Sequence, residues 1–117
     1  MSYAEKLKHP HWLALRARLF QEQRHLCNDC GEYFGDSKGL ELHHCWYECG
    51  KDPWDYPDDC FLVLCRKCHV TRQKVQNSAQ VVLGQLSRLL SVEELKVLTF
   101  ELVARKSDLQ RNEVFEL

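Results

Sequence analysis

The chain has 117 residues and a formal net charge of −1 at pH 7, and seven of its residues are cysteines. This length allows one small domain, or a compact core with one appended element, and the charge excludes a polycation. No secretory signal segment and no apolar run of about 18 residues occurs, so we expect neither export nor a membrane span. Closely spaced cysteines in such a chain favour metal ligation over disulfides and predict a reducing, cytoplasmic location.

The N-terminal part predicts one amphipathic helix followed by a cysteine turn. Residues 1–9 carry no strong pattern and are expected to be loosely ordered. Pro10 suits the first position of a helix. From His11 to Gln23, apolar residues recur at helical spacing, at Trp12, Leu15, Leu19 and Phe20. The tight turn Cys27-Asn28-Asp29-Cys30-Gly31 then has the spacing of a zinc knuckle.

Two short apolar runs, Leu40 to Cys45 and Phe61 to Cys65, are expected to pair as strands. The segment between them, Trp46 to Cys60, is expected to form a loop because it contains glycine and two prolines. We expect the aromatic side chains of this loop to pack it against the fold. These side chains are Trp46, Tyr47, Trp54 and Tyr56.

The last 50 or so residues predict a helical hairpin. A helix is expected from about His69, with an apolar seam at Val75, Ala79, Val82, Leu86 and Leu89. Ser91-Val92-Glu93-Glu94 has the form of a capping box and opens a second helix, with a stripe at Leu95, Leu98, Leu102 and Leu109. Such stripes usually belong to a core, and the alternative is an interface with a partner or a second copy. We therefore predict an α+β fold, with a core at residues 1–75 and a helical extension at 76–117 that packs on the core or forms an interface.

Two CxxC pairs form the strongest motif: Cys27/Cys30 and Cys65/Cys68, separated by 34 residues. Each pair places two sulfurs on one turn, and two such turns complete the tetrahedral four-cysteine site that structural zinc prefers. The alternatives are unliganded thiols or a redox-active pair, but no thioredoxin-like βαβ pattern surrounds either pair. A closed zinc site leaves three cysteines and the nearby histidines without a role.

Three histidines on or beside the expected strand pair have the arrangement that phosphodiester hydrolysis needs. On a strand, His43 and His44 point to opposite faces, while His69 lies at the expected helix start beside the hairpin. This arrangement can bring His43 and His69 to one divalent ion and leave His44 free nearby. A divalent ion stabilises charge on the scissile phosphate and the leaving oxygen. A neutral imidazole takes a proton from the attacking water.

The pattern as a whole resembles a known family. The sequence Trp12…Arg16…Cys27-x-x-Cys30-Gly31…Leu42-His43-His44…Leu62-x-Leu64-Cys65-x-x-Cys68-His69 is similar to the zinc-containing branch of the HNH endonucleases, which have the ββα-metal fold. The resemblance covers roughly residues 10–75. The stretch His43-His44-x-x-Tyr47, with Pro53-Trp54-x-Tyr56 later, is similar to a subgroup common in bacterial and phage genomes.

The resemblance implies a role for each histidine. His43 would be the first ligand of a catalytic ion, His44 the general base, and His69 the second ligand. The catalytic ion would be Mg²⁺, or Mn²⁺, Ni²⁺ or Zn²⁺, beside a structural Zn²⁺, and the product ends would be a 5′-phosphate and a 3′-hydroxyl. Cys60 stands where the family has its middle asparagine, five residues before Cys65. A thiol does not reproduce the hydrogen bonds of an amide.

Other functions stay open. The three histidines can be packing residues of a zinc-stabilised module that binds nucleic acid or a protein, for example an accessory protein in phage–host conflict. Cys45, Cys49 and Cys60 can join a histidine in a second zinc site, or fill apolar space. Five bases and no acid occur from Cys60 to Val92, which suits DNA or a solvated helix face. The candidates for DNA contact are Arg66, Lys67, Arg72 and Lys74.

Overall fold

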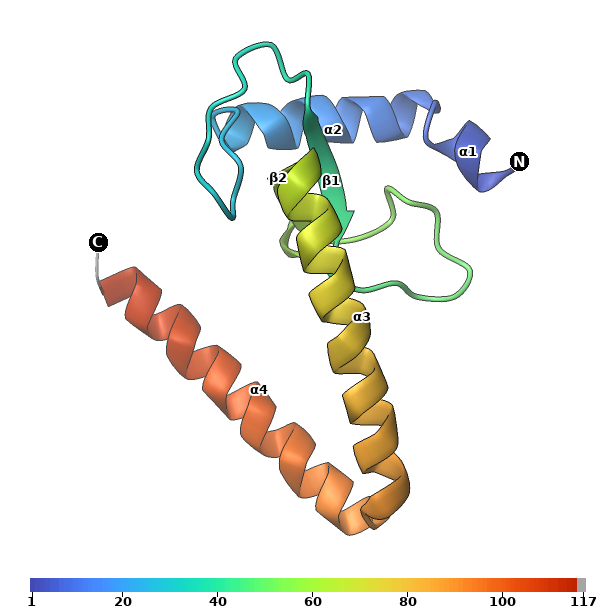
Figure 1. Cartoon of the computed structure of the whole chain (residues 1–117), viewed down its shortest axis with the longest axis vertical. Helices are drawn as coiled ribbons and strands as arrows, with labels where there is room; N and C mark the ends of the chain where they lie inside the picture. The colour runs from blue at the N-terminus through green and yellow to red at the C-terminus, as the bar shows by residue number, and fades with distance from the viewer. Residues whose placement is uncertain (116–117) are drawn as a thin grey trace. The chain divides into compact units, whose positions relative to one another are not determined.

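The computed structural model describes the backbone of residues 1–115 and the side chains of residues 1–106. In chain order the elements are α1 (Tyr3–Lys6), α2 (Pro10–Glu22), β1 (Leu40–His44), the short 3-10 helix η1 (Asp58–Cys60), β2 (Phe61–Cys65), α3 (Arg66–Leu89) and α4 (Val92–Phe115) (Figure 1). These elements confirm the predicted α+β class. The chain divides into two compact units, Met1–Lys74 and Val75–Leu117, so α3 begins in the first and ends in the second.

The two strands pair antiparallel, as predicted, with Leu40 opposite Cys65 and His44 opposite Phe61. Successive side chains of a strand point to opposite faces of the sheet. His44 therefore shares a face with Phe61 and contacts the aromatic residues of the core on that side. His43 lies on the other face, where it meets the first turns of α3. The sheet thus separates the two adjacent histidines.

Helix α2 covers one face of the sheet. Pro10 lies in its first turn, as predicted, and Nδ1 of His9 accepts a hydrogen bond from the backbone N–H of His11. The large apolar side chains of the helix that face the sheet are buried: Trp12, Leu19 and Phe20. The Trp12 ring lies nearly parallel to the His44 ring, with the two centroids 5.5 Å apart. The apolar core therefore extends to His44, one of the candidate site histidines.

The loop between β1 and η1 is only partly packed against the fold. The buried Tyr56 hydroxyl lies 2.8 Å from the backbone nitrogen of Glu48, whose N–H donates to it, and 3.3 Å from the Glu48 carbonyl. Tyr56 and Trp54 pack on the core as expected. Tyr47 is exposed on one side but stacks on the His44 ring, with the two centroids 4.7 Å apart, so it also packs the loop against the fold as expected. Trp46 remains exposed, so the prediction is wrong for this side chain.

Two helix boundaries differ from the sequence prediction. Residues Tyr3–Lys6 are helical because Ser2 and Glu5 form a reciprocal capping box, with hydrogen bonds of 3.2 and 3.3 Å between each backbone N–H and the other side chain. Helix α3 begins at Arg66 instead of His69. The last two ligand candidates, Cys68 and His69, are therefore both placed by the start of a helix.

In the second unit, helical stripes are present but do not cover one another. Ser91 and Glu94 form the predicted capping box at the start of α4, with hydrogen bonds of 3.1 and 3.0 Å. Val82 and Leu89 on α3 and Leu102 on α4 are exposed, so the stripes do not bury one another over residues 75–106. Leu109 of the predicted stripe lies outside the described side chains. Among the described residues, no helix is long and apolar enough to cross a membrane.

Candidate functional site

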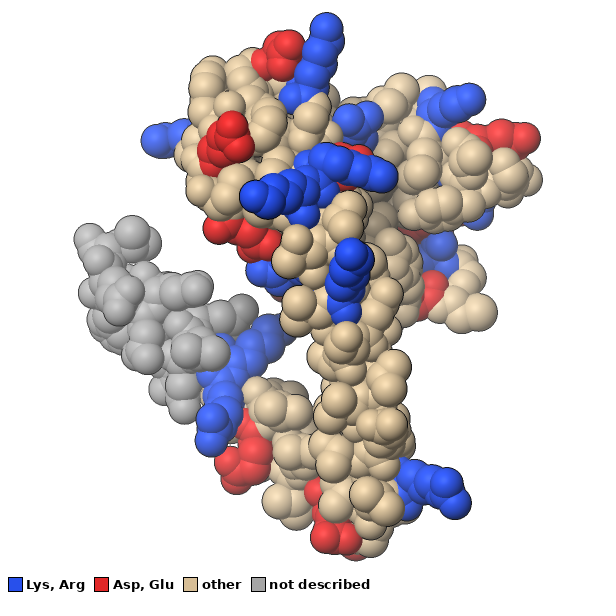
Figure 2. Space-filling model, viewed as in Figure 1, with Lys and Arg blue, Asp and Glu red and all other residues tan. Residues whose placement is uncertain are grey.

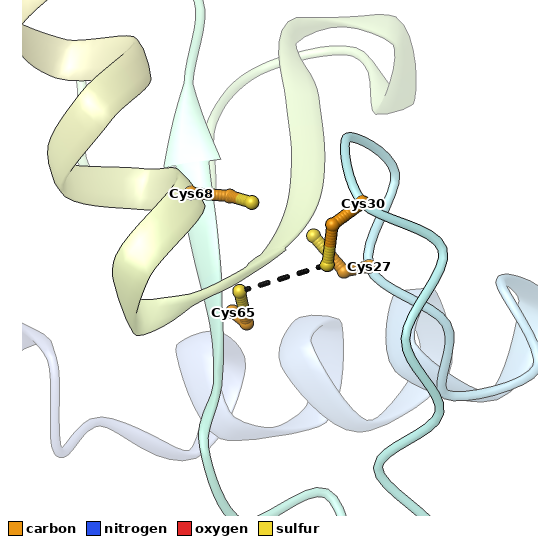
Figure 3. A group of neighbouring side chains, drawn as sticks. All are labelled: Cys27, Cys30, Cys65 and Cys68. Carbon is orange, nitrogen blue, oxygen red and sulfur yellow. Dashed lines mark hydrogen bonds between the residues drawn. The ribbon is translucent and has the colours of Figure 1, made fainter.

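Four cysteine sulfurs converge from three parts of the first unit. Cys27 and Cys30 lie in the turn after α2, Cys65 ends β2, and Cys68 lies in the first turn of α3 (Figure 3). All four sulfurs lie within 4.8 Å of one another, and the Cys30 and Cys65 sulfurs are 4.0 Å apart. Thiolates bound about 2.3 Å from one zinc ion would have their sulfurs about 3.8 Å apart. The donor set and its spacing therefore fit one tetrahedral zinc ion.

The turn that carries Cys27 is held by hydrogen bonds to β2 and α3. The backbone N–H of Asn28 donates to the Val63 carbonyl at 2.7 Å, and the Asn28 side-chain oxygen accepts from the Val63 N–H at 2.8 Å. Arg72 donates two hydrogen bonds, of 2.8 and 2.7 Å, to the carboxylate of Asp29. Burial opposes ionisation of the Cys27 thiol, but hydrogen bonds from backbone N–H groups outweigh it and lower its pKa to about 6. A thiolate is the form that binds zinc.

The other three cysteines lie outside this cluster. Cys60 is buried, Cys45 is half-buried and Cys49 is exposed. Within the part of the chain that the structure describes, the four-cysteine cluster is the one group of three or more His, Cys, Asp or Glu side chains placed to share an ion. The second zinc site considered for these cysteines therefore has no support in the geometry.

His43 and His69 come together on the α3 side of the sheet. Their ring centroids are 5.3 Å apart and the rings are nearly perpendicular, at 77°. Nδ1 of His69 is 2.9 Å from a carboxylate oxygen of Glu41, and the other oxygen of Glu41 accepts from Arg66 at 3.1 Å. Burial raises the pKa of Glu41, but these hydrogen bonds outweigh it and hold the pKa below its ordinary value. A carboxylate on one imidazole nitrogen fixes the tautomer and leaves the other nitrogen for a ligand.

His44 lies on the opposite face and is only 2% exposed. Its ring is sandwiched between Trp12 and Tyr47, with the Tyr47 centroid 4.7 Å away. Nε2 of His44 lies 2.9 Å from the backbone carbonyl oxygen of Pro53. Because a carbonyl only accepts, Nε2 carries the proton and Nδ1 is the basic nitrogen. Burial lowers the pKa of His44, which favours the neutral ring.

A cavity of about 420 Å³ opens beside His44 and His69. Its polar lining includes Arg16 and Glu41, and its aromatic lining includes Tyr3, Trp12 and Tyr47. The guanidinium of Arg16 lies 5.2 Å from the centroid of the Phe20 ring. Among the ion pairs of the described residues, none occupies Arg16. This cavity therefore combines an arginine available for an anion with two of the three candidate histidines.

The basic residues predicted to contact DNA differ in their surroundings. Figure 2 shows lysine and arginine side chains over the start of α3. Arg66 pairs with Glu41 at 3.1 Å, and Arg72 is held by Asp29. The Lys67 and Lys74 side chains are exposed. Arg66 and Arg72 thus have their charge balanced by a carboxylate, which weakens their attraction for phosphate.

Several residues of the cavity were not predicted as site residues from the sequence. Arg16 follows Trp12 at helical spacing, which could have placed it beside the buried ring. Glu41 precedes His43 by two strand positions and therefore shares its face. Tyr3 lies in a segment expected to be loosely ordered. Pro53 acts through its backbone carbonyl, for which the sequence holds no signal.

No protein-family model, curated protein or solved structure matches the chain. The arrangement of the side chains described above is therefore the basis for proposing a function.

Proposed function

We propose that the protein is an HNH-type, divalent-metal-dependent endonuclease that hydrolyses phosphodiester bonds in DNA. The observation that supports this most is the environment of His44. Its ring is fixed between two aromatic rings, its Nε2 is bonded to the Pro53 carbonyl, and it lines an open cavity together with Arg16. A general base needs this combination of fixed tautomer, basic nitrogen and space for substrate.

In the proposed mechanism each residue has a separate role. His43 and His69 would hold the catalytic ion, which when bound stabilises charge on the scissile phosphate and the leaving oxygen. His44 takes a proton from the attacking water at Nδ1 while its Nε2–H remains on Pro53. Arg16 donates hydrogen bonds to phosphate oxygens, for which a guanidinium fork is well suited. The product ends are a 5′-phosphate and a 3′-hydroxyl.

In the family that the sequence resembles, the asparagine at the position of Cys60 braces the loop that carries the base, and we infer that Cys60 provides part of this bracing. Its fully buried thiol donates to the Trp46 carbonyl at 3.4 Å, and its own carbonyl accepts from the Cys45 N–H at 2.8 Å. These contacts brace the start of the loop that carries the carbonyl of Pro53. We therefore expect Cys60→Asn to cleave DNA at the wild-type rate or faster, because an amide N–H is a stronger donor to the Trp46 carbonyl than a thiol.

The proposal is tested by incubating supercoiled plasmid with the wild type and with His44→Ala, in magnesium or manganese and with a chelator control. We expect His44→Ala to lower the cleavage rate by about a hundredfold to ten-thousandfold, because a general base is lost. Its zinc content should be unchanged, and its fold should be retained at lower stability because the buried His44 ring packs between Trp12 and Tyr47. His43→Ala and His69→Ala should instead weaken binding of the catalytic ion, so added metal should partly restore their activity.

Two results count against the enzyme. One is a metal-replete wild type that leaves plasmid, single-stranded DNA and RNA intact. The other is a His44→Ala variant that cuts as well as the wild type, which would identify a contaminating nuclease. Either result favours the second candidate, a zinc-stabilised module that binds nucleic acid or protein. The pairing of Arg66 and Arg72 with carboxylates weakens nucleic-acid binding and so favours the protein-binding form of this candidate, as do the exposed apolar faces of α3 and α4.

The proposed partners are DNA and, through the C-terminal helices, a second copy of the chain or another protein. We place the protein in the cytoplasm of a bacterial or phage-infected cell, because four thiolate ligands persist best in a reducing compartment.

A further inference from the structure

The lining of the cavity beside His44 combines polar and aromatic side chains. Arg16, His44 and His69 contribute polar groups, and Tyr3, Trp12 and Tyr47 contribute aromatic rings. Two of these rings, Tyr3 and Tyr47, are 53% and 60% exposed. Flat aromatic surface is therefore available to a ligand directly beside the candidate base.

A phosphate alone does not account for these aromatic rings. Phosphate recognition needs cations and N–H donors, which the polar residues of the lining supply. A duplex keeps its bases stacked on one another, so it presents sugar and phosphate to a backbone-binding site. An unpaired nucleotide also presents the face of its base, which stacks on aromatic side chains regardless of sequence. The cavity volume of about 420 Å³ is within the range of sites that enclose a small ligand.

The charge of the protein also favours an unpaired nucleotide over duplex DNA. Binding of duplex DNA depends strongly on neutralising phosphates with several lysines and arginines. This chain has a net charge of −1, and Arg66 and Arg72 are already paired with Glu41 and Asp29. Base stacking adds affinity that does not depend on charge, so it is of most use to a protein that has no net positive charge.

We propose that the cavity receives an unpaired nucleotide and that the preferred substrate is single-stranded DNA, with Tyr3 and Tyr47 stacking on a base next to the scissile phosphate. This inference rests on the proposed function, since it names the substrate of the same site. Tyr3 is the better residue to test, because Tyr47 also stacks on His44 and its removal would disturb the base.

The experiment measures binding of a short fluorescent oligonucleotide, single-stranded or annealed to its complement, to the zinc-loaded full chain without magnesium. Fluorescence anisotropy at one fixed ionic strength gives the dissociation constants. The variants are Tyr3→Ala, Tyr3→Phe, which keeps the ring, and Tyr33→Ala. Tyr33 is a matched control because it is also exposed, at 67% against 53% for Tyr3, and does not line the cavity.

We expect the single strand to bind more tightly than the duplex. Tyr3→Ala should weaken single-strand binding by about tenfold, the usual effect of losing one stacking ring. Tyr3→Phe and Tyr33→Ala should bind like the wild type. Equal or tighter duplex binding, or equal losses in Tyr3→Ala and Tyr33→Ala, would overturn the inference.

Cleavage assays with magnesium separate this inference from the proposed function. If a single strand binds in a Tyr3-dependent way but is never cut, the nucleotide site is supported and the proposed endonuclease activity is contradicted. If cleavage of duplex plasmid requires His44 and is unaffected by Tyr3→Ala, the endonuclease activity is supported and the preference for an unpaired strand is contradicted.

Discussion

At the scale of single residues, weak contacts brace the loop whose Pro53 carbonyl holds the candidate base His44. One of them is the hydrogen bond from the fully buried Cys60 thiol to the Trp46 carbonyl, which is 3.4 Å long. Replacing Cys60 by alanine removes this bond and leaves a small void. We expect the free energy of unfolding to fall by about 1 kcal/mol, measured by urea titration with tryptophan fluorescence.

Serine is the matched control at this position, because its hydroxyl can donate to the same carbonyl. Cys60→Ser should therefore be more stable than Cys60→Ala and cleave DNA faster. Equal stability of the two variants would show that the thiol acts only as an apolar filler and does not brace the loop.

Arg16 and Arg18 offer a direct test of anion binding by the cavity. They lie on the same helix, but Arg18 is bound by Asp58 at 2.8 and 2.9 Å and by Glu22 at 3.1 Å. Arg16→Gln should weaken DNA binding and lower the slope of log affinity against log salt by about 1, as expected for one lost phosphate contact. Arg18→Gln removes the same charge and should leave both quantities unchanged. Equal effects of the two variants would mean that Arg16 contributes only to the overall electrostatic potential of the protein and contacts no phosphate.

At the scale of elements, short-range patterns predicted most of the fold. Pro10 placed the start of α2 and the Ser91 capping box placed the start of α4. The alternation of strand side chains correctly separated His43 from His44. Helix α1 was missed because the capping residues Ser2 and Glu5 precede no apolar run, although the capping box itself was readable.

Contacts between elements were beyond the sequence patterns. The stacking of Tyr47 on His44 depends on how the loop after β1 folds back over the strand. The bond from His44 to the Pro53 carbonyl joins a side chain to a backbone group nine positions away. Neither contact has a fixed spacing in the chain, since loop conformation is set by packing and by turns that many sequences share.

We expect the distal part of α3 to depend on a partner for its stability. Residues 75–87 carry no charged side chain, and Figure 2 shows this stretch without blue or red. Three valines and Gly84 give it low intrinsic helix propensity, so it depends on contacts that cover its apolar side. The seam from Val75 to Leu89 alternates in steps of four and three, as in paired helices. Because its flanks are uncharged, an identical helix meets no repulsion, and we expect a second copy there.

A substitution on the seam tests this expectation. Val82 is 52% exposed, and Val82→Glu places a charge in the proposed contact while raising helix propensity. We expect the wild type to be a dimer by light scattering and Val82→Glu to be a monomer. Gln80→Glu adds the same charge on an exposed position outside the seam and should remain dimeric. A monomeric wild type, or equal behaviour of the two variants, would contradict pairing through this seam.

At the scale of the whole molecule, we expect the first unit to depend on more than its apolar core, because a chain of this length buries a limited core. Its sheet has two strands, and a two-stranded sheet is marginally stable by itself. The four-cysteine cluster joins the turn after α2, the end of β2 and the start of α3. A zinc ion there cross-links three elements, and its binding energy is also folding energy. We therefore expect about one zinc per chain and a first unit that folds only with it.

Cys68→Ser should lose zinc and unfold residues 1–74, whereas Cys49→Ser should keep both zinc and fold, because Cys49 is exposed and lies outside the cluster. Elemental analysis gives the zinc content of each purified variant. Tryptophan fluorescence follows the first unit specifically, since Trp12, Trp46 and Trp54 all belong to it. Emission should shift to longer wavelength as the buried Trp12 meets water. A well-folded wild type without zinc would show that hydrogen bonds such as that between Asn28 and Val63 hold the fold without the ion.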